Sequence, residues 1–96
     1  MENNDYAMQI AIHLQDYCKE WKYDYIERLQ ERKTAQNFYR IFCKFTKTYF
    51  AVINGEHHNV TFFKDGSVTV KRCGKGFDER PFDARLTIEE ILPYLP

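Results

Sequence analysis

The sequence predicts one α+β domain, in which a long N-terminal amphipathic helix packs on a three- or four-stranded antiparallel meander and a short helix follows at the C-terminus. Three observations predict this fold class. Apolar residues recur at helical spacing over the first third of the chain, aromatic and β-branched residues dominate the middle, and the turn pairs Asn54-Gly55 and Asp65-Gly66 divide that middle part. A chain of 96 residues has room for one core, so we expect a single domain over residues 1–96.

The composition is that of a folded protein without a general attraction to polyanions. Hydrophobic residues make up 44% and charged residues 29% of the chain, and 14 Lys and Arg residues balance 14 Asp and Glu residues. The acidic N-terminus resembles no signal peptide, and no apolar run approaches the length of a membrane span. Cys18, Cys43 and Cys73 are an odd number without CxxC spacing, which is typical of a reducing compartment. We therefore expect a cytoplasmic protein with no membrane partner.

The first expected element is a helix over about residues 5–33. Its apolar positions recur at steps of three and four, with no Gly or Pro between them; they are Ala7, Ile10, Ala11, Leu14, Tyr17, Cys18, Trp21, Tyr25 and Leu29. An unbroken helix of this length would be roughly 40 Å long. We expect it to be continuous.

Strands are expected at about 38–45, 48–53, 58–64 and 67–73, where aromatic and β-branched residues concentrate. The meander formed by the last three is the firmest part, because Asn54-Gly55 and Asp65-Gly66 both tolerate the positive φ angles of a tight hairpin turn. The segment 34–47 is ambiguous, since Ala35, Phe38 and Phe42 also fit one face of a helix. Its aromatic content favours a strand.

The C-terminal segment predicts a loop over residues 77–85 and a short helix over about 87–95. Thr87 suits the N-cap position, and Glu90 three residues later completes a capping-box pattern. Pro93 and Pro96 limit the helix length.

The hairpin register sorts the strands into two faces if Asp65 and Gly66 alone form the second turn. Phe63 then lies opposite Val68, and the same parity runs through the other turns. The face expected to pack against the helix contains Tyr39, Ile41, Cys43, Phe45, Phe50, Val52, Phe63, Val68 and Val70. The opposite face contains Phe38, Arg40, Phe42, Lys44, Tyr49, Ala51, Ile53, Val60, Phe62, Lys64, Thr69 and Lys71.

This second face mixes aromatic and basic side chains, and it has two interpretations. Either the C-terminal helix covers it, or it binds a partner through Phe38, Arg40, Phe42, Lys44, Tyr49, Phe62, Lys64 and Lys71. Aromatic residues interleaved with Arg and Lys on an open sheet are also what proteins use to bind single-stranded nucleic acid.

A second candidate surface is an acidic stripe on the long helix. Asp16, Glu20, Asp24, Glu27 and Glu31 follow one another at steps of three or four residues. Such a row could engage a basic protein groove, although solvated helices often carry one without any function.

No catalytic, cofactor or metal motif is present in the sequence. Glu56, His57 and His58 are adjacent, but neighbouring residues of a strand point to opposite faces, which argues against a shared metal ion. Only a cleft that joins His57 or His58 to a carboxylate would favour an enzyme. We therefore expect no catalytic residues, no metal and no cofactor.

The first hypothesis for function is a non-enzymatic protein-interaction module. Small charge-balanced proteins of this kind include inhibitors that phages and mobile elements direct against host machinery, such as anti-CRISPR or anti-restriction factors. The alternatives are a nucleic-acid-binding domain that uses the aromatic and basic sheet face, and a homodimeric adaptor.

Overall fold

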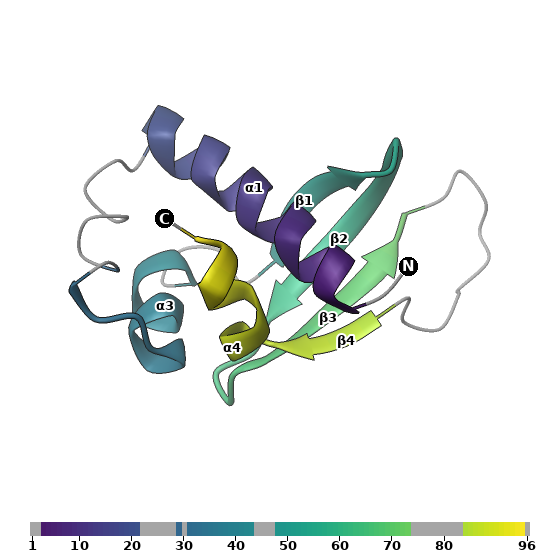
Figure 1. Cartoon of the computed structure of the whole chain (residues 1–96). Coiled ribbons are helices and arrows are strands. Elements are labelled where there is room, and N and C mark those ends of the chain that lie inside the picture. Colours follow the sequence, from purple (N-terminus) through teal and green to yellow (C-terminus); the bar gives the residue numbers. More distant parts are fainter. Residues whose placement is uncertain (1–2, 22–28, 30, 44–47, 74–83, 96) are drawn as a thin grey trace.

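The computed structural model describes residues 3–21, 29, 31–43, 48–73 and 84–95, with the side chains of the first helix described to Asp16. The helices are α1 (Asn3–Trp21), α3 (Ala35–Phe42) and α4 (Ile88–Ile91), and α4 continues into the 3₁₀ turn η1 (Leu92–Tyr94). The strands are β1 (Thr48–Ile53), β2 (Glu56–Phe62), β3 (Ser67–Arg72) and β4 (Ala84–Thr87). The predicted α+β class is confirmed: an N-terminal helix, an antiparallel sheet and a short C-terminal helix (Figure 1).

The four strands form an antiparallel meander in the order β1-β2-β3-β4. Asn54 and Gly55 join the first two strands as a two-residue turn, with Ile53 opposite Glu56. Both turn residues have positive φ, 52° for Asn54 and 76° for Gly55, as this kind of hairpin requires. The turn and β1 lie where the sequence predicts them, and β2 covers residues 56–62 in place of the predicted 58–64.

The second hairpin differs from the prediction by one residue. The amide of Phe63 donates to the carbonyl of Ser67, and the amide of Gly66 donates back to the carbonyl of Phe63. Lys64, Asp65 and Gly66 therefore form a three-residue loop, in which Gly66 has a φ of 91° and occupies the extra position of a bulge. Val68 consequently lies opposite Phe62, not Phe63.

This one-residue shift inverts the predicted faces of β1 and β2. Side chains alternate along a strand, so a slip of one residue exchanges the buried and exposed sets. The buried residues of the sheet are Ala51, Ile53, His58, Val60, Phe62, Val68, Val70, Ala84 and Leu86. Phe50, Val52 and Phe63, which the sequence assigned to the core, are exposed. The assignment of Val68 and Val70 to the core was correct.

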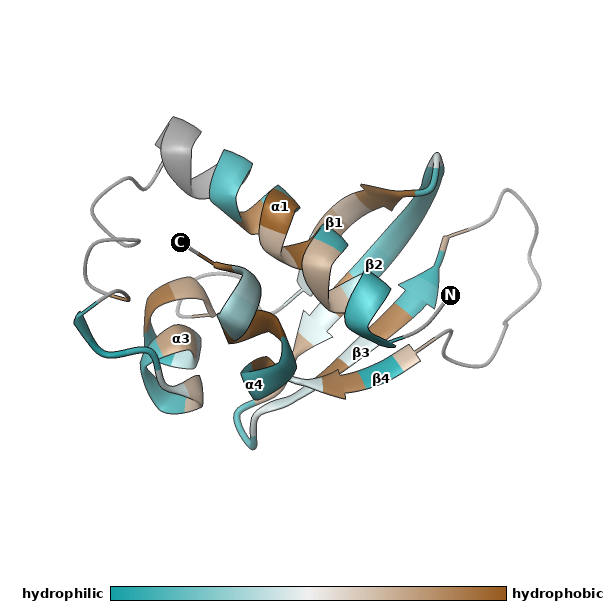
Figure 2. Cartoon of the chain, viewed as in Figure 1, coloured by the Kyte–Doolittle hydropathy of each residue, from teal (hydrophilic) through white to brown (hydrophobic). Residues whose placement is uncertain are grey.

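Helix α1 packs across the buried face of the sheet (Figure 1). Ala7, Ile10, Ala11 and Leu14 are buried along one side of it, as the helical spacing predicts, and Figure 2 shows hydrophobic and hydrophilic bands alternating around the helix. Leu29 is buried as well. The predicted continuation of the helix through residues 22–28 lies outside the described residues.

Two side chains of α1 bond to opposite edges of the sheet. Asn3 donates from Nδ2 to the carbonyl of Arg85 in β4 at 2.9 Å, and His13 contacts the carbonyl of Val52 in β1 through Nε2 at 2.6 Å. Ten residues of helix extend about 15 Å, and four strands span about 14 Å. The helix therefore reaches from one edge of the sheet to the other.

The predicted strand over 38–45 is wrong for residues 38–42, because residues 35–42 form helix α3. Residues 44 and 45 lie outside the described residues. Thr34 caps this helix: its backbone is extended, and its hydroxyl accepts from the amide of Asn37 at 3.1 Å. Helical spacing places the rings of Phe38 and Phe42 on one face, 4.7 Å apart. Phe38 also packs against Phe62, at 5.2 Å between ring centres.

The C-terminal part contains a strand that the sequence analysis missed. Residues 84–87 form β4, which covers the end of the predicted loop over 77–85 and the first residue of the predicted helix, and α4 begins directly after it. The predicted capping box at Thr87 is confirmed, with the Thr87 amide donating to the Glu90 carboxylate at 2.6 Å. Ile88 and Ile91 of α4 are buried in the same core as α1, so the helix lies on the face that α1 covers and leaves the opposite face open.

Candidate functional site

The candidate site is the face of the sheet turned away from the helices, called the outer face below. Its residues alternate with the buried ones along each strand. They are Thr48, Phe50 and Val52 of β1, His57, Asn59 and Thr61 of β2, Ser67, Thr69 and Lys71 of β3, and Arg85 and Thr87 of β4. All three described helices pack on the other side or at the end of the sheet (Figure 1).

The β1 side of the outer face is apolar and aromatic. Phe50 is 60% exposed and Val52 is 43% exposed. The ring of His57, on the neighbouring strand, lies 5.4 Å from the ring of Phe50 at an interplanar angle of 42°. Two exposed rings on adjacent strands form a surface against which a flat group can stack.

The other side of the outer face is basic and polar. Lys71 of β3 lies opposite Asn59, and the exposed Arg85 of β4 lies opposite Thr69. Two strand spacings, about 10 Å, separate the aromatic strand β1 from β3. Thr61 and Asn59 lie between them and add hydrogen-bonding side chains.

Among its described residues the outer face has cations but no carboxylate. The two acidic residues of the hairpins are engaged by other groups. Glu56 contacts Arg72 at 3.2 Å, and Asp65 accepts from both the amide and the hydroxyl of Ser67, at 2.9 and 2.6 Å. These bonds lower the pKa of Asp65.

Of the eight residues that the sequence assigned to a partner-binding sheet face, Lys71 lies on the outer face. Phe38 and Phe62 are buried in the core, so their assignment is wrong. Phe42 is half-buried in α3, and Arg40 is exposed on α3 and not on the sheet. Tyr49 points to the helix side, where its hydroxyl donates to the carbonyl of His13 at 2.7 Å. Lys64 is exposed in the hairpin loop, and Lys44 lies outside the described residues.

The acidic stripe is described only at its two ends. Asp16 on α1 and Glu31 are exposed. The side chains of Glu20, Asp24 and Glu27 lie outside the described residues, so the stripe stays a prediction.

A cavity of about 180 Å³ brings His58 and Glu56 together, beside Tyr6 and Arg72. His58 is only 2% exposed, and its Nδ1 contacts the backbone carbonyl of Glu56 at 2.8 Å. The Glu56 carboxylate contacts Arg72 instead. The Tyr6 ring meets the imidazole edge-on at 6.0 Å. The contact with the Glu56 carbonyl therefore gives this buried histidine a hydrogen-bond partner.

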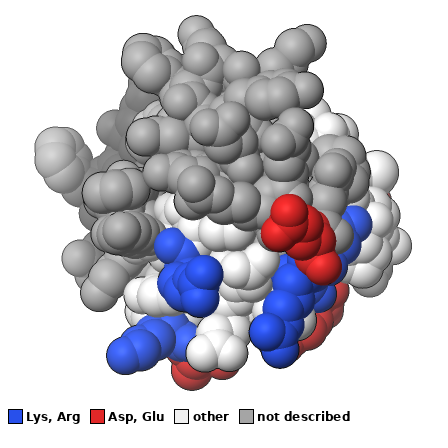
Figure 3. All heavy atoms as spheres, turned by 90° about the vertical axis from the view of Figure 1, so that its left-hand side faces the viewer, with Lys and Arg blue, Asp and Glu red and all other residues white. Residues whose placement is uncertain are grey.

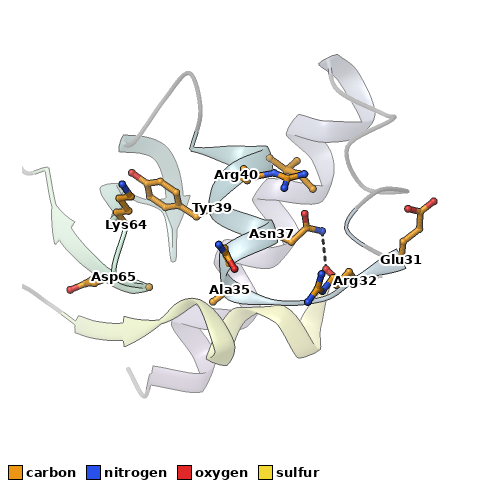
Figure 4. Close-up of a pocket in the computed structure, with 11 residues that line it drawn as sticks. Glu31, Arg32, Ala35, Asn37, Tyr39, Arg40, Lys64 and Asp65 are labelled. Atoms are coloured by element: carbon orange, nitrogen blue, oxygen red, sulfur yellow. Dashed lines mark hydrogen bonds between the residues drawn. The ribbon is translucent and has the colours of Figure 1, made fainter.

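The described residues also line a wide open depression of about 1410 Å³ between α3 and the β2–β3 hairpin. Figure 4 shows Lys64 and Asp65 on the hairpin, and Tyr39 and Arg40 on α3. Charges of both signs border it, and Figure 3 shows this end of the molecule with Lys and Arg beside Asp and Glu. The mixed charge and the absence of a buried polar group among the described lining residues favour no particular ligand.

No group of His, Cys, Asp and Glu in the described part of the chain is arranged to hold a metal ion. Within the same residues, no helix has the length and apolar character needed to cross a membrane.

The sequence analysis did not identify Phe50, Val52, His57 or Arg85 as surface residues of one face. A signal for the correct face was present in β2, where polar Asn59 and Thr61 alternate with apolar Val60 and Phe62. This alternation assigns Val60 and Phe62 to the core, as the structure has them.

Comparison with protein-family models, with curated proteins and with solved structures finds no match to this chain.

Proposed function

We propose that this chain is a non-enzymatic binding module and that its working surface is the outer face. The observation that carries the proposal is the exposure of Phe50 and Val52 side by side on β1, next to the exposed His57. Burial of each large apolar side chain contributes about 1.5–3 kcal/mol. A partner that covers this part of the sheet therefore gains affinity there.

A protein partner is one form of this proposal. Aromatic residues and Arg are enriched in protein interfaces, and the outer face offers both. The narrower hypothesis of an inhibitor from a phage or mobile element, of the anti-CRISPR or anti-restriction type, is one such case. It rests on the size and charge balance of the chain, and no described contact favours one particular partner protein.

A homodimer that joins two outer faces has less support. The described residues of a second copy's outer face include no carboxylate that could approach Lys71. Sedimentation across the micromolar range tests this alternative, and a concentration-dependent dimer that Phe50→Asp dissolves would favour it.

The proposal is tested by capturing partners from a cellular lysate with the tagged chain. The double variant Phe50→Asp and Val52→Asp changes the outer face, while Ile12→Asp changes a residue of similar exposure, 46%, on α1. Circular dichroism verifies that each variant folds. The bound fraction is analysed for both protein and nucleic acid.

We expect the double variant to lose the partner and Ile12→Asp to retain it. Equal recovery by the wild type and a folded double variant would show that the outer face is not the working surface.

A further inference from the structure

We propose that the outer face binds single-stranded nucleic acid, with bases stacked on Phe50 and His57 and the phosphate backbone held by Lys71. This inference rests on the proposed function, because it names the class of partner for the same surface. Three features of the described residues lead to it: exposed rings, hydrogen-bonding side chains between the strands, and charge of one sign.

The rings are placed for stacking. Phe50 is the most exposed large hydrophobic residue of the described part of the chain, and His57 lies beside it at 5.4 Å with a different tilt. Because the two rings come from adjacent strands, they can contact successive unstacked bases. Every base has a flat apolar face, so this contact needs no particular base sequence.

The polar side chains continue from the rings across the sheet. Asn59 lies opposite Phe50, and Lys71 lies opposite Asn59, so these residues form one row across β1, β2 and β3. Thr61, Thr69 and Arg85 form the next row. A strand of nucleic acid laid across these rows meets aromatic groups on one side and cations, amide and hydroxyl groups on the other.

Charge complementarity favours a polyanion over a second copy of the chain. The whole chain has 14 positive and 14 negative residues, yet the described outer face has cations only. The surface is a sheet face without a projecting helix or ribbon that could enter a duplex groove, which favours single strands over double strands. Few cations contribute, so the binding should depend only moderately on salt.

The experiment is fluorescence anisotropy with labelled oligo-dT and oligo-U of about 15 nucleotides, a length that covers the usual site sizes. Each is titrated with the full chain between about 50 and about 200 mM salt, and a matched duplex is measured alongside. The outer-face variants are Phe50→Ala and Lys71→Gln. The controls are Ile12→Ala on α1 and Arg40→Gln on α3, both changes of exposed residues away from the outer face.

We expect both single strands to bind more tightly than the duplex. Phe50→Ala should weaken binding at least about fivefold, because one stacked base is lost. Lys71→Gln should weaken it and reduce the slope of log affinity against log salt by about 0.7, the value for one phosphate contact on a single strand. Ile12→Ala and Arg40→Gln should bind like the wild type.

Three results would overturn the inference: no anisotropy change at micromolar protein, duplex binding as tight as single-strand binding, or a loss with Arg40→Gln but not with Phe50→Ala. The lysate capture separates this failure from failure of the proposed function. If no oligonucleotide binds but capture still depends on Phe50 and Val52, the partner is a protein and the outer face remains the working surface. If capture is also unaffected, both proposals are wrong.

Discussion

The imidazole Nε2 of His13 lies 2.6 Å from the carbonyl oxygen of Val52, so a side chain of α1 bonds directly to the edge of β1. The carbonyl can only accept, and Nε2 must therefore carry the proton in this contact. β1 has no charged residue and no proline, the usual features that prevent an edge strand from pairing with another chain. His13 is the helix residue that occupies part of this edge.

Removal of the His13 contact should destabilise the fold. We expect His13→Ala to reduce the free energy of unfolding by about 0.5–1.5 kcal/mol, the usual contribution of one hydrogen bond. His13→Gln, whose amide can still donate, should lose less. Urea denaturation measures both, and a His13→Ala midpoint equal to that of the wild type would refute the structural role.

Gly66 should resist substitution because of its backbone conformation. Its φ is 91°, and an added Cβ would meet the Cβ of Ala35 only at 4.0 Å, an ordinary contact. The cost of Gly66→Ala therefore comes from the positive φ and should be about 1–2 kcal/mol. Thermal or urea denaturation measures it, with Lys64→Ala as a control at an exposed residue of the same loop whose φ is not positive. An unchanged stability would argue against the three-residue loop.

The fold class followed from the sequence because its signals are local. The spacing of Ala7, Ile10 and Leu14 fixes the face of α1, and Asn54-Gly55 permits only a tight turn. The register of the strands could not be predicted in the same way. An Asp-Gly pair fits a two-residue turn and also a three-residue loop with Gly at the bulge, and these differ by one residue in every pairing that follows.

The other two differences depend in part on contacts between distant parts of the chain. Phe38 and Phe42 fit a strand by residue type. In the structure, the Thr34 cap and the packing of Phe38 on Phe62 stabilise a helix instead. β4 has four residues, too few for a periodic signal, and it is defined by pairing with β3. Because the candidate site depends on the register, Lys71 is the one described residue of the predicted partner-binding set that lies on the outer face.

Asp65 gives a dependence of stability on pH. The Ser67 hydroxyl and amide lower the pKa of this carboxyl below its ordinary value of 3.8. Because its pKa is lower in the folded state, the ionised Asp65 carboxylate stabilises the fold at pH values above the pKa of the unfolded chain. This stabilisation is lost as the pH falls from the unfolded-state pKa toward the folded-state pKa. We expect Ser67→Ala to raise the pKa of Asp65 toward 3.8 in an NMR titration of the carboxyl carbon. The loop geometry would be in doubt if the value did not move.

Cys43 should be unreactive in the folded protein. Burial raises its pKa to about 12, so the thiolate that reacts with alkylating reagents is scarce at pH values near 8. Labelling with iodoacetamide, followed by mass spectrometry of the separate peptides, should find Cys43 modified much more slowly than the half-buried Cys73. Both should react once the chain is unfolded in urea. Rapid labelling of Cys43 without denaturant would contradict its burial.

Both functional proposals depend on which residues lie on the exposed face of the sheet. The adjacent residues Phe62 and Phe63 test this assignment most directly. Phe62 is 2% exposed and Phe63 is 43% exposed, although they differ by one position. The measurement is the free energy of unfolding of Phe62→Ala and Phe63→Ala by urea denaturation. The structure predicts a loss of about 3–5 kcal/mol for Phe62→Ala and a change within about 0.5 kcal/mol for Phe63→Ala. The reverse order would show that Phe50 and Val52 face the core and that the outer face is not the binding surface.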